Sequence, residues 1–188
     1  MFIRSERLFL RPGWPEDWQE LLAGIGDEAV VRNLAKAPWP YTADDARWFA
    51  ARPQDPRCPH FCVTVPSSLE PARIIGSIGL GLNDGEIELG YWIARDHWGR
   101  GYATEAARAV LRLAGILGHR RITAGHFTDN PASAKVLRKV GFAPTGEVRP
   151  RFSLARGRAV PAVIHAVALH DPSDCDGPDL PDMVQRVA

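Results

Sequence analysis

The hydrophobic and polar residues of the chain follow two different periods. Short apolar stretches that alternate with polar residues, bounded by Gly, Pro and Asn, predict β-strands at residues 6–11, 60–65, 73–82, 86–93, 121–127, 142–152 and 160–169. Helical spacing of apolar residues and capping residues predict helices at residues 15–22, 27–35, 43–51, 102–117 and 131–140. No internal repeat or linker divides this series, so we expect one domain of the α/β class.

Several of these elements begin or end at residues with a defined physical role. The run Asn83-Asp84-Gly85 predicts the tight turn of a β-hairpin. Thr42 and Asn130 are expected to cap the helices that follow them, because their side-chain oxygens can accept from free N–H groups of the first turn. Gly141 is expected to end the later helix in a left-handed conformation.

The composition is that of an ordinary globular protein. Of the 188 residues, 45% are hydrophobic and 24% are charged, and the net charge is +1. This balance predicts no general attraction to nucleic acid or membranes, and no apolar run is long enough to cross a bilayer. Charges stand near the N-terminus where a signal peptide needs an apolar core, so a cytoplasmic location is expected. Residues 1–170 are expected to form the domain and residues 171–188, rich in Pro and Asp, a C-terminal tail.

The cysteine and histidine residues predict no metal site. Three cysteines cannot form a complete set of intrachain disulfides. Cys58, His60 and Cys62 fall on the same side of an extended segment, but a closed zinc site needs four ligands, and no second pair is spaced to complete it. We therefore expect reduced, structural cysteines.

A glycine-rich turn joins the predicted strand 86–93 directly to the next helix. Such a turn leaves N–H groups of the first helical turn without an intrahelical partner, and the helix dipole adds partial positive charge. Gly99 and Gly101 lack a Cβ, so a ligand can approach the main chain closely. The turn therefore predicts a phosphate or pyrophosphate site, although it matches neither GxxxxGK[ST] nor GxGxxG. Gly76, Gly79 and Gly81 lead into another strand and predict bulges or a close chain approach.

Four stretches, in this order, carry a more specific signal. They are residues 6–12 (ERLFLRP), 38–46 (PWPYTADDA), 98–106 (WGRGYATEA) and 130–142 (NPASAKVLRKVGF). Together they resemble the GCN5-related N-acetyltransferase (GNAT) superfamily, and most closely its RimJ/RimL-like branch of ribosomal-protein N-acetyltransferases. The resemblance implies a single-domain α/β GNAT fold with a mixed, mostly antiparallel central sheet flanked by helices. It also implies a splay between the strands near 86–93 and 121–127.

The resemblance further implies acetyl-CoA as co-substrate. The cofactor pyrophosphate would lie on the glycine turn, where the residues implied are Trp98, Gly99, Arg100, Gly101, Tyr102, Ala103 and Thr104. The thioester would lie in the splay, where the backbone N–H of Ile93 or a near neighbour would bind the developing oxyanion. Asn130 is expected to cap its helix and to touch the pantetheine arm.

Two side chains are candidates for proton transfer. Glu88 shares a strand face with Gly90 beside the splay, so it is expected to assist deprotonation of the amine, directly or through water. Glu86 is interpreted as a charge at the hairpin edge. The tyrosine with which many GNAT enzymes protonate the leaving thiolate is replaced by Leu137. Ser133 matches the serine of the RimL-like pattern, and is either that acid or a residue that helps to cap the helix.

The expected function is transfer of the acetyl group of acetyl-CoA to a primary amine by direct attack in a ternary complex. The amine would belong to a protein N-terminus or to a small molecule, recognised by loops around residues 24–42 and 146–160. An aspartate found near the end of relatives is replaced by Val160-Pro161-Ala162, which leaves the acceptor open. Two alternatives remain: another acyl donor or acceptor on the same fold, and a catalytically decayed CoA-binding sensor or interaction module. The chain is expected to be a monomer or homodimer.

Overall fold

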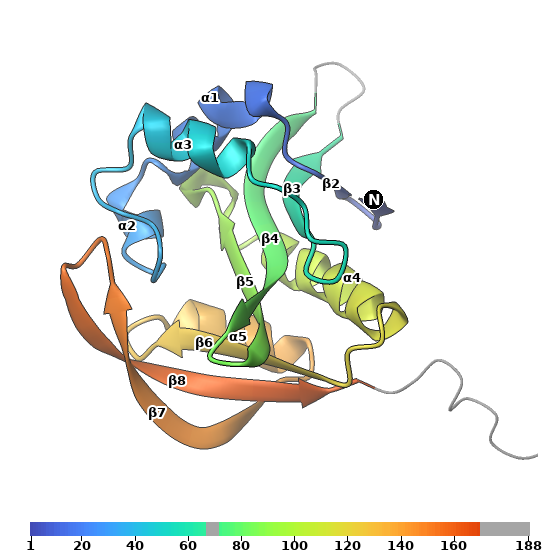
Figure 1. The fold of residues 1–188 in the computed structure, drawn as a ribbon, viewed down its shortest axis with the longest axis vertical. Coiled ribbons are helices and arrows are strands. Elements are labelled where there is room, and N and C mark those ends of the chain that lie inside the picture. The colour runs from blue at the N-terminus through green and yellow to red at the C-terminus, as the bar shows by residue number, and fades with distance from the viewer. Residues whose placement is uncertain (67–71, 170–188) are drawn as a thin grey trace, which may run out of the picture.

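A computed structural model describes residues 1–66 and 72–169 of the chain (Figure 1). Its strands are β1 (Ile3–Arg4), β2 (Phe9–Arg11), β3 (His60–Val65), β4 (Arg73–Asn83), β5 (Glu86–Ile93), β6 (Arg121–Phe127), β7 (Ala143–Ser153) and β8 (Arg158–Ala168). Its α-helices are α1 (Trp18–Ile25), α2 (Glu28–Val31), α3 (Ala43–Ala50), α4 (Tyr102–Ile116) and α5 (Pro131–Lys139), and short 3₁₀ turns lie at Pro15–Asp17 and Arg95–His97. The expected tail, residues 171–188, lies outside the described residues.

The eight strands form one sheet in the order β1-β2-β3-β4-β5-β6-β8-β7. All neighbouring strands are antiparallel except β5 and β6, which are parallel and share the single residue pair Glu88–Thr123. β6 then turns away from β5, so that the two strands cross at a wide angle (Figure 1). The mixed, mostly antiparallel sheet and its splay are therefore confirmed.

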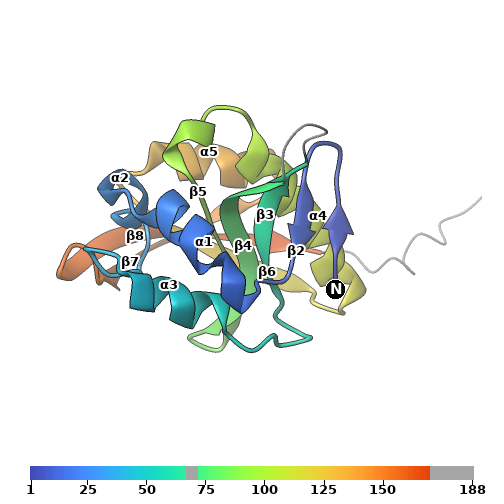
Figure 2. The same cartoon turned by 90° about the horizontal axis from the view of Figure 1, so that it is seen from above.

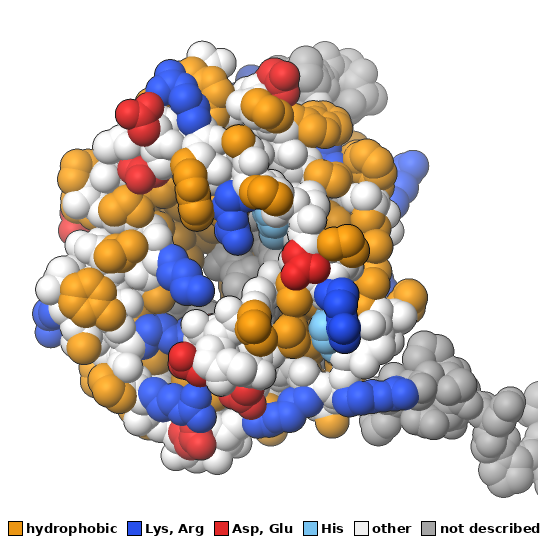
Figure 3. Space-filling model, viewed as in Figure 1, with side chains coloured by type: hydrophobic (Ala, Val, Ile, Leu, Met, Phe, Trp, Pro, Cys, Tyr) orange, Lys and Arg blue, Asp and Glu red, His pale blue; other side chains and the backbone are white. Residues whose placement is uncertain are grey.

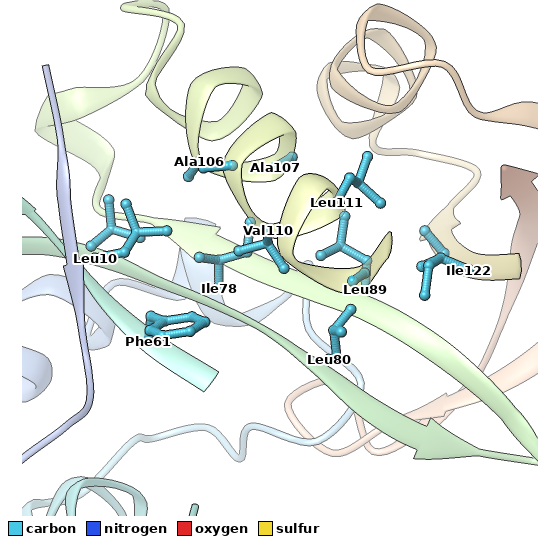
Figure 4. Close-up of a cluster of buried hydrophobic side chains, with 14 of the residues drawn as sticks. Leu10, Phe61, Ile78, Leu80, Leu89, Ala106, Ala107, Val110, Leu111 and Ile122 are labelled. Atoms are coloured by element: carbon cyan, nitrogen blue, oxygen red, sulfur yellow. The ribbon is translucent and has the colours of Figure 1, made fainter. Parts of the chain in front are cut away.

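Helices cover both faces of the sheet (Figure 2). On one face, α4 and α5 pack over the main core, where Val110 meets Ile78, Leu89 and Ile122 (Figure 4). On the other face, α1, α2 and α3 form a second cluster around Trp92. Because side chains alternate along a strand, Leu89 and Tyr91 of β5 belong to the α4 side, and Trp92 to the α1 side.

Local signals in the sequence placed most element boundaries within one or two residues. The hairpin turn is confirmed, with Asp84 at φ 50° and Gly85 at φ 80°. The close chain approach predicted at two glycines is also confirmed, because a Cβ would lie 2.3 Å from the Trp92 carbonyl at Gly76 and 2.6 Å from the His60 Cα at Gly79. At Gly81 a Cβ would meet no described atom within 4 Å.

Two predicted elements are shorter than expected. The strand predicted at 6–11 begins only at Phe9, because residues 5–8 form a turn in which Ser5 N–H donates to the Leu8 carbonyl (3.0 Å). The helix predicted at 27–35 ends at Val31 after one turn. Its start is fixed by Asp27, whose carboxylate accepts from Ala29 N–H, but the following residues form only turns.

Candidate active site

The glycine turn presents an uncapped helix start. Gly99 and Gly101 have φ of 74° and 82°, the left-handed region in which glycine is not strained. α2, α3 and α5 each begin with a side chain that accepts from a first-turn N–H, but among the described residues no side chain caps α4. The first N–H groups of α4 are therefore free for an anion, with the helix dipole behind them.

A salt bridge from the N-terminal hairpin braces this turn. The Glu105 carboxylate accepts from Ser5 Oγ (2.7 Å), Arg7 N–H (2.7 Å) and Arg7 Nε (2.8 Å). Arg7 Nη1 donates to the Arg100 carbonyl (3.0 Å). Because C=O and N–H point in opposite directions across one peptide bond, this contact turns the Gly101 N–H away from Arg7, toward the open side of the turn. The sequence indicated Arg7 only as part of a strand, and did not predict its contacts with Glu105 and the Arg100 carbonyl.

The Arg7–Glu105 salt bridge should weaken at low pH. Burial raises the pKa of Glu105, but the hydrogen bonds from Arg7 and Ser5 lower it by a larger amount. The pKa of Glu105 therefore lies below its ordinary value. Because the pKa of Glu105 is lower in the folded than in the unfolded protein, ionised Glu105 stabilises the fold at pH values above its unfolded-state pKa. This stabilisation is lost as the pH falls through the folded-state pKa. We expect Glu105→Gln to lower the melting temperature at pH 7 and much less at pH 3. Thermal unfolding followed by circular dichroism at both pH values measures this difference, and Glu16→Gln, which changes an exposed carboxylate, is the control. An equal loss of melting temperature at pH 7 and pH 3 would contradict the prediction.

The splay directs a backbone donor into the gap between β5 and β6. Ala94 N–H donates to the Ile75 carbonyl on the β4 side (2.8 Å), so strand alternation directs the N–H and C=O of Ile93 toward β6. The indole Nε1 of Trp98 donates to that Ile93 carbonyl (2.6 Å). This contact ties the glycine turn to the end of β5, and the Ile93 N–H remains directed at the gap.

Glu88 lies at the point where the splay begins, and its carboxylate is already engaged. Arg151 of β7 donates to both of its oxygens, with Nη2 at 3.0 Å from Oε2, and Asn83 Nδ2 donates to Oε2 (2.8 Å). The Arg151 side chain passes over Gly125 to reach Glu88. A Cβ at Gly125 would lie only 2.9 Å from Arg151 Nη1. A carboxylate offers about four acceptor positions, so one remains for an ammonium group or a water. The sequence did not predict Arg151 as a partner.

The opposite face of β5 carries a second polar contact. The Tyr91 hydroxyl lies 2.8 Å from Ser133 Oγ, in the first turn of α5. Asn130 Oδ1 accepts from Ser133 N–H (3.2 Å), so the predicted cap of α5 is confirmed. Leu137, which stands where many GNAT enzymes have tyrosine, is fully buried in the core. Thr104, expected to offer a hydroxyl to the cofactor, is 8% exposed.

The α1 side of the splay opens into a hollow. Gly90 is exposed although β5 lies in the middle of the sheet, and no described atom lies within 4 Å of a Cβ placed there. The β7–β8 hairpin bounds this side and is tied to the segment after α2, since Leu154 N–H donates to the Ala35 carbonyl (3.0 Å) and Ser153 Oγ to the Leu34 carbonyl (3.2 Å). Figure 3 shows a hollow near the middle of the molecule, with hydrophobic, basic, acidic and histidine side chains around it.

Comparison with known proteins identifies the arrangement. A family model described as "Acetyltransferase (GNAT) domain" matches residues 7–143. The chain belongs to the GNAT acetyltransferase family. The uncharacterized N-acetyltransferase p20 of Bacillus licheniformis is 33% identical over 165 residues, which cover 84% of this chain and 90% of that protein. The GNAT resemblance in the sequence is thereby confirmed, and the chain is an acetyltransferase enzyme.

Solved structures share the GNAT fold. The GNAT-family acetyltransferase from Bacillus anthracis matches with a TM-score of 0.76 at 23% identity, over 89% of this chain and 98% of that one. The microcin C7 self-immunity acetyltransferase MccE, solved with acetyl-CoA and AMP, matches with a TM-score of 0.72 at 17% identity, over 88% of this chain and 94% of that one. At these identities the likeness concerns the fold alone.

Three further findings concern the described part of this GNAT domain. No helix among the described residues is long and apolar enough to cross a membrane. Within residues 1–66 and 72–169, no three His, Cys, Asp or Glu side chains lie together as a metal site would need. Burial raises the pKa of Cys62 to about 12, so this thiol stays protonated and unreactive at neutral pH.

Proposed function

We propose that this GNAT enzyme transfers the acetyl group of acetyl-CoA to a primary amine, by direct attack in a ternary complex. The observation that carries the proposal is the uncapped start of α4 beside the splay, with Gly99 and Gly101 in left-handed conformations. Free N–H groups and a helix dipole suit the cofactor pyrophosphate. A thioester placed in the splay would meet the Ile93 N–H, which is directed into the same gap.

Glu88 supports the proposal as the group that receives a proton from the amine. A primary amine with a pKa near 10 is only about one part in 10³ neutral at pH 7, so removing its proton lowers the barrier by up to about 4 kcal/mol. Glu88 faces the hollow side of β5, beside exposed Gly90. Its remaining acceptor position serves an ammonium group or a bridging water, while Arg151 and Asn83 hold the carboxylate in place.

Replacing Glu88 with Gln should lower kcat by about tenfold at pH 7, since water can still take the proton. The defect should shrink as the pH rises toward the pKa of the amine, because the neutral amine then needs no base. Steady-state rates from pH 6.5 to 10 measure this. Glu86→Gln is the matched control, because Glu86 lies on the same face two residues earlier, near Arg121 (3.5 Å) at the hairpin edge. Equal rates of Glu88→Gln and wild type at every pH would remove Glu88 from the mechanism.

Ser133 supports the proposal as the donor to the leaving thiolate. A thiol with a pKa near 8.5 leaves tolerably well unaided, so Ser133→Ala should lower single-turnover acetyl transfer only by about tenfold. The melting temperature should fall by only a few degrees at most, because Asn130 still caps α5 and only the hydrogen bond with Tyr91 is lost. An unchanged single-turnover rate would leave Ser133 as a helix-start residue only.

The acceptor is the open part of the proposal. The order of motifs and the Asn130–Ser133 pair favour the RimJ/RimL-like branch, and hence a protein N-terminus; a small-molecule amine is the other acceptor class. We suggest measuring acetyl-CoA consumption with N-terminal peptides, polyamines, amino acids and aminoglycosides. Turnover with one class supports the enzyme and names its acceptor. CoA binding without turnover on any class would favour a CoA-binding sensor instead.

A further inference from the structure

We propose that Tyr91 is a positioning residue for Ser133: its hydroxyl donates to Ser133 Oγ and leaves the serine O–H free to donate to the cofactor sulfur. This inference rests on the proposed acetyl-CoA site. It gives β5 two functions, because Glu88 would serve the amine on one face of the strand while Tyr91 serves the thiolate on the other.

The position of Tyr91 carries the argument. Tyr91 lies on β5 beyond Glu88, which forms the last residue pair with β6, so it stands in the open part of the splay. Its hydroxyl crosses from β5 to the first turn of α5 and lies 2.8 Å from Ser133 Oγ. Its ring packs against the core under α4, which fixes the direction of the hydroxyl.

The chemistry of the two hydroxyl groups decides which one donates. A phenol is the stronger hydrogen-bond donor, and burial raises the pKa of Tyr91 to about 12, so it keeps its proton throughout the working pH range. A serine in the first turn of a helix otherwise tends to bond to nearby backbone groups. A hydrogen bond accepted from Tyr91 holds Ser133 Oγ away from the backbone and polarises its own O–H.

In the acyl transfer, the neutral amine attacks the thioester carbon, the C–N bond forms, and the C–S bond breaks with its electron pair on sulfur. The amine proton leaves to Glu88 or water. The Ser133 O–H donates a hydrogen bond to the thiolate, which later takes a proton from water. Tyr91 touches neither substrate nor sulfur in this scheme and acts only through Ser133.

The binding of free CoA tests the inference without turnover. A hydrogen bond donated to the thiolate lowers the pKa of the bound thiol, so the affinity for CoA should rise as the pH passes through that pKa. Desulfo-CoA has no titrating sulfur and corrects for all other pH effects. Isothermal titration calorimetry from pH 7 to 9.5 should show the affinity ratio of CoA to desulfo-CoA rising about tenfold in the wild type, which corresponds to a shift of one pKa unit.

Tyr91→Phe should keep desulfo-CoA affinity and reduce that rise to less than about twofold, as should Ser133→Ala. The double variant should lose nothing more, because one residue acts through the other. Thr64→Val is the control, since it removes a different buried hydroxyl, bonded to the Phe9 carbonyl in β2, and should leave the rise intact.

The outcomes separate this inference from the proposed function. A tenfold rise that persists in Tyr91→Phe overturns the role of Tyr91 alone. The affinity ratio of CoA to desulfo-CoA could rise with pH in the wild type and fail to rise in Tyr91→Phe and Ser133→Ala, while the wild type turns over no amine. That result would support the Tyr91–Ser133 pair and contradict acetyl transfer. No CoA binding at any pH overturns both.

Discussion

Replacing Gly101 with Val should weaken CoA binding by about 100-fold, or about 2.7 kcal/mol. A Cβ at Gly101 would lie 3.5 Å from Arg7 Nη2, so the Val side chain would contact Arg7 and disturb the start of α4, where the free N–H groups would bind the pyrophosphate. It would also strain the backbone, because φ is 82° at this position, and we expect a loss of about 1–2 kcal/mol of folding stability. Calorimetric titration with CoA and chemical denaturation measure the two effects separately.

Gly118→Val is the matched control for this change. Gly118 follows the other end of α4 with φ 84°, and a Cβ there would meet no described atom within 4 Å. The control variant should therefore lose similar stability without losing CoA affinity. Unchanged CoA affinity in a folded Gly101→Val protein would show that the cofactor binds elsewhere.

Replacing Asp17 with Ala should destabilise the fold by about 3–5 kcal/mol, because it leaves a largely buried guanidinium without its partner. Arg11 donates to both Asp17 oxygens (2.6 and 2.7 Å), and the two side chains are only 12% and 9% exposed. Trp14 N–H also donates to Asp17 (2.7 Å). In a domain of this size the melting temperature should fall by about 10 °C, as differential scanning calorimetry would show.

Two further variants make this second prediction sharper. Asp44→Ala removes a solvent-exposed partner of Arg47 and should hardly change the melting temperature, since exposed ion pairs contribute little. The double replacement of Arg11 by Met and Asp17 by Leu should be less harmful than Asp17→Ala alone, because no charge is left buried without a partner. A melting temperature of Asp17→Ala within 2 °C of the wild type would contradict the stabilising role of the pair.

Most features predicted correctly from the residues themselves rest on residues close together in the chain, whereas the splay between β5 and β6 was implied by the family resemblance. Thr42 accepts from Asp45 N–H and Asn130 from Ser133 N–H, so both caps act over three residues. The Asn83-Asp84-Gly85 turn and the left-handed conformation of Gly141 (φ 94°) are equally local. The glycine turn that leads directly into α4 could be predicted for the same reason, although its occupant could not be derived from local geometry alone.

The contacts that were missed join residues far apart in the sequence. Arg7 and Glu105 are separated by 98 residues, Glu88 and Arg151 by 63, and Tyr91 and Ser133 by 42. Side-chain alternation along β5 puts Tyr91 on the face opposite Glu88, but alternation alone does not say which helix covers that face. Nothing in the residues around Glu88 indicated that an arginine of β7 would reach it across Gly125.

The sequence by itself determined most of the strands, the helix caps, the glycine turn and, through its four motifs, the GNAT family. Short-range hydrogen bonds and side-chain periodicity specify these features, so they are written in neighbouring residues. Only the tertiary structure decided which polar groups meet at the splay. The order of strands brings β7 and α5 to the two faces of β5, and this order depends on how the whole core is buried. Residues that are unremarkable in the sequence, Arg7, Tyr91 and Arg151, thereby become partners of the candidate site.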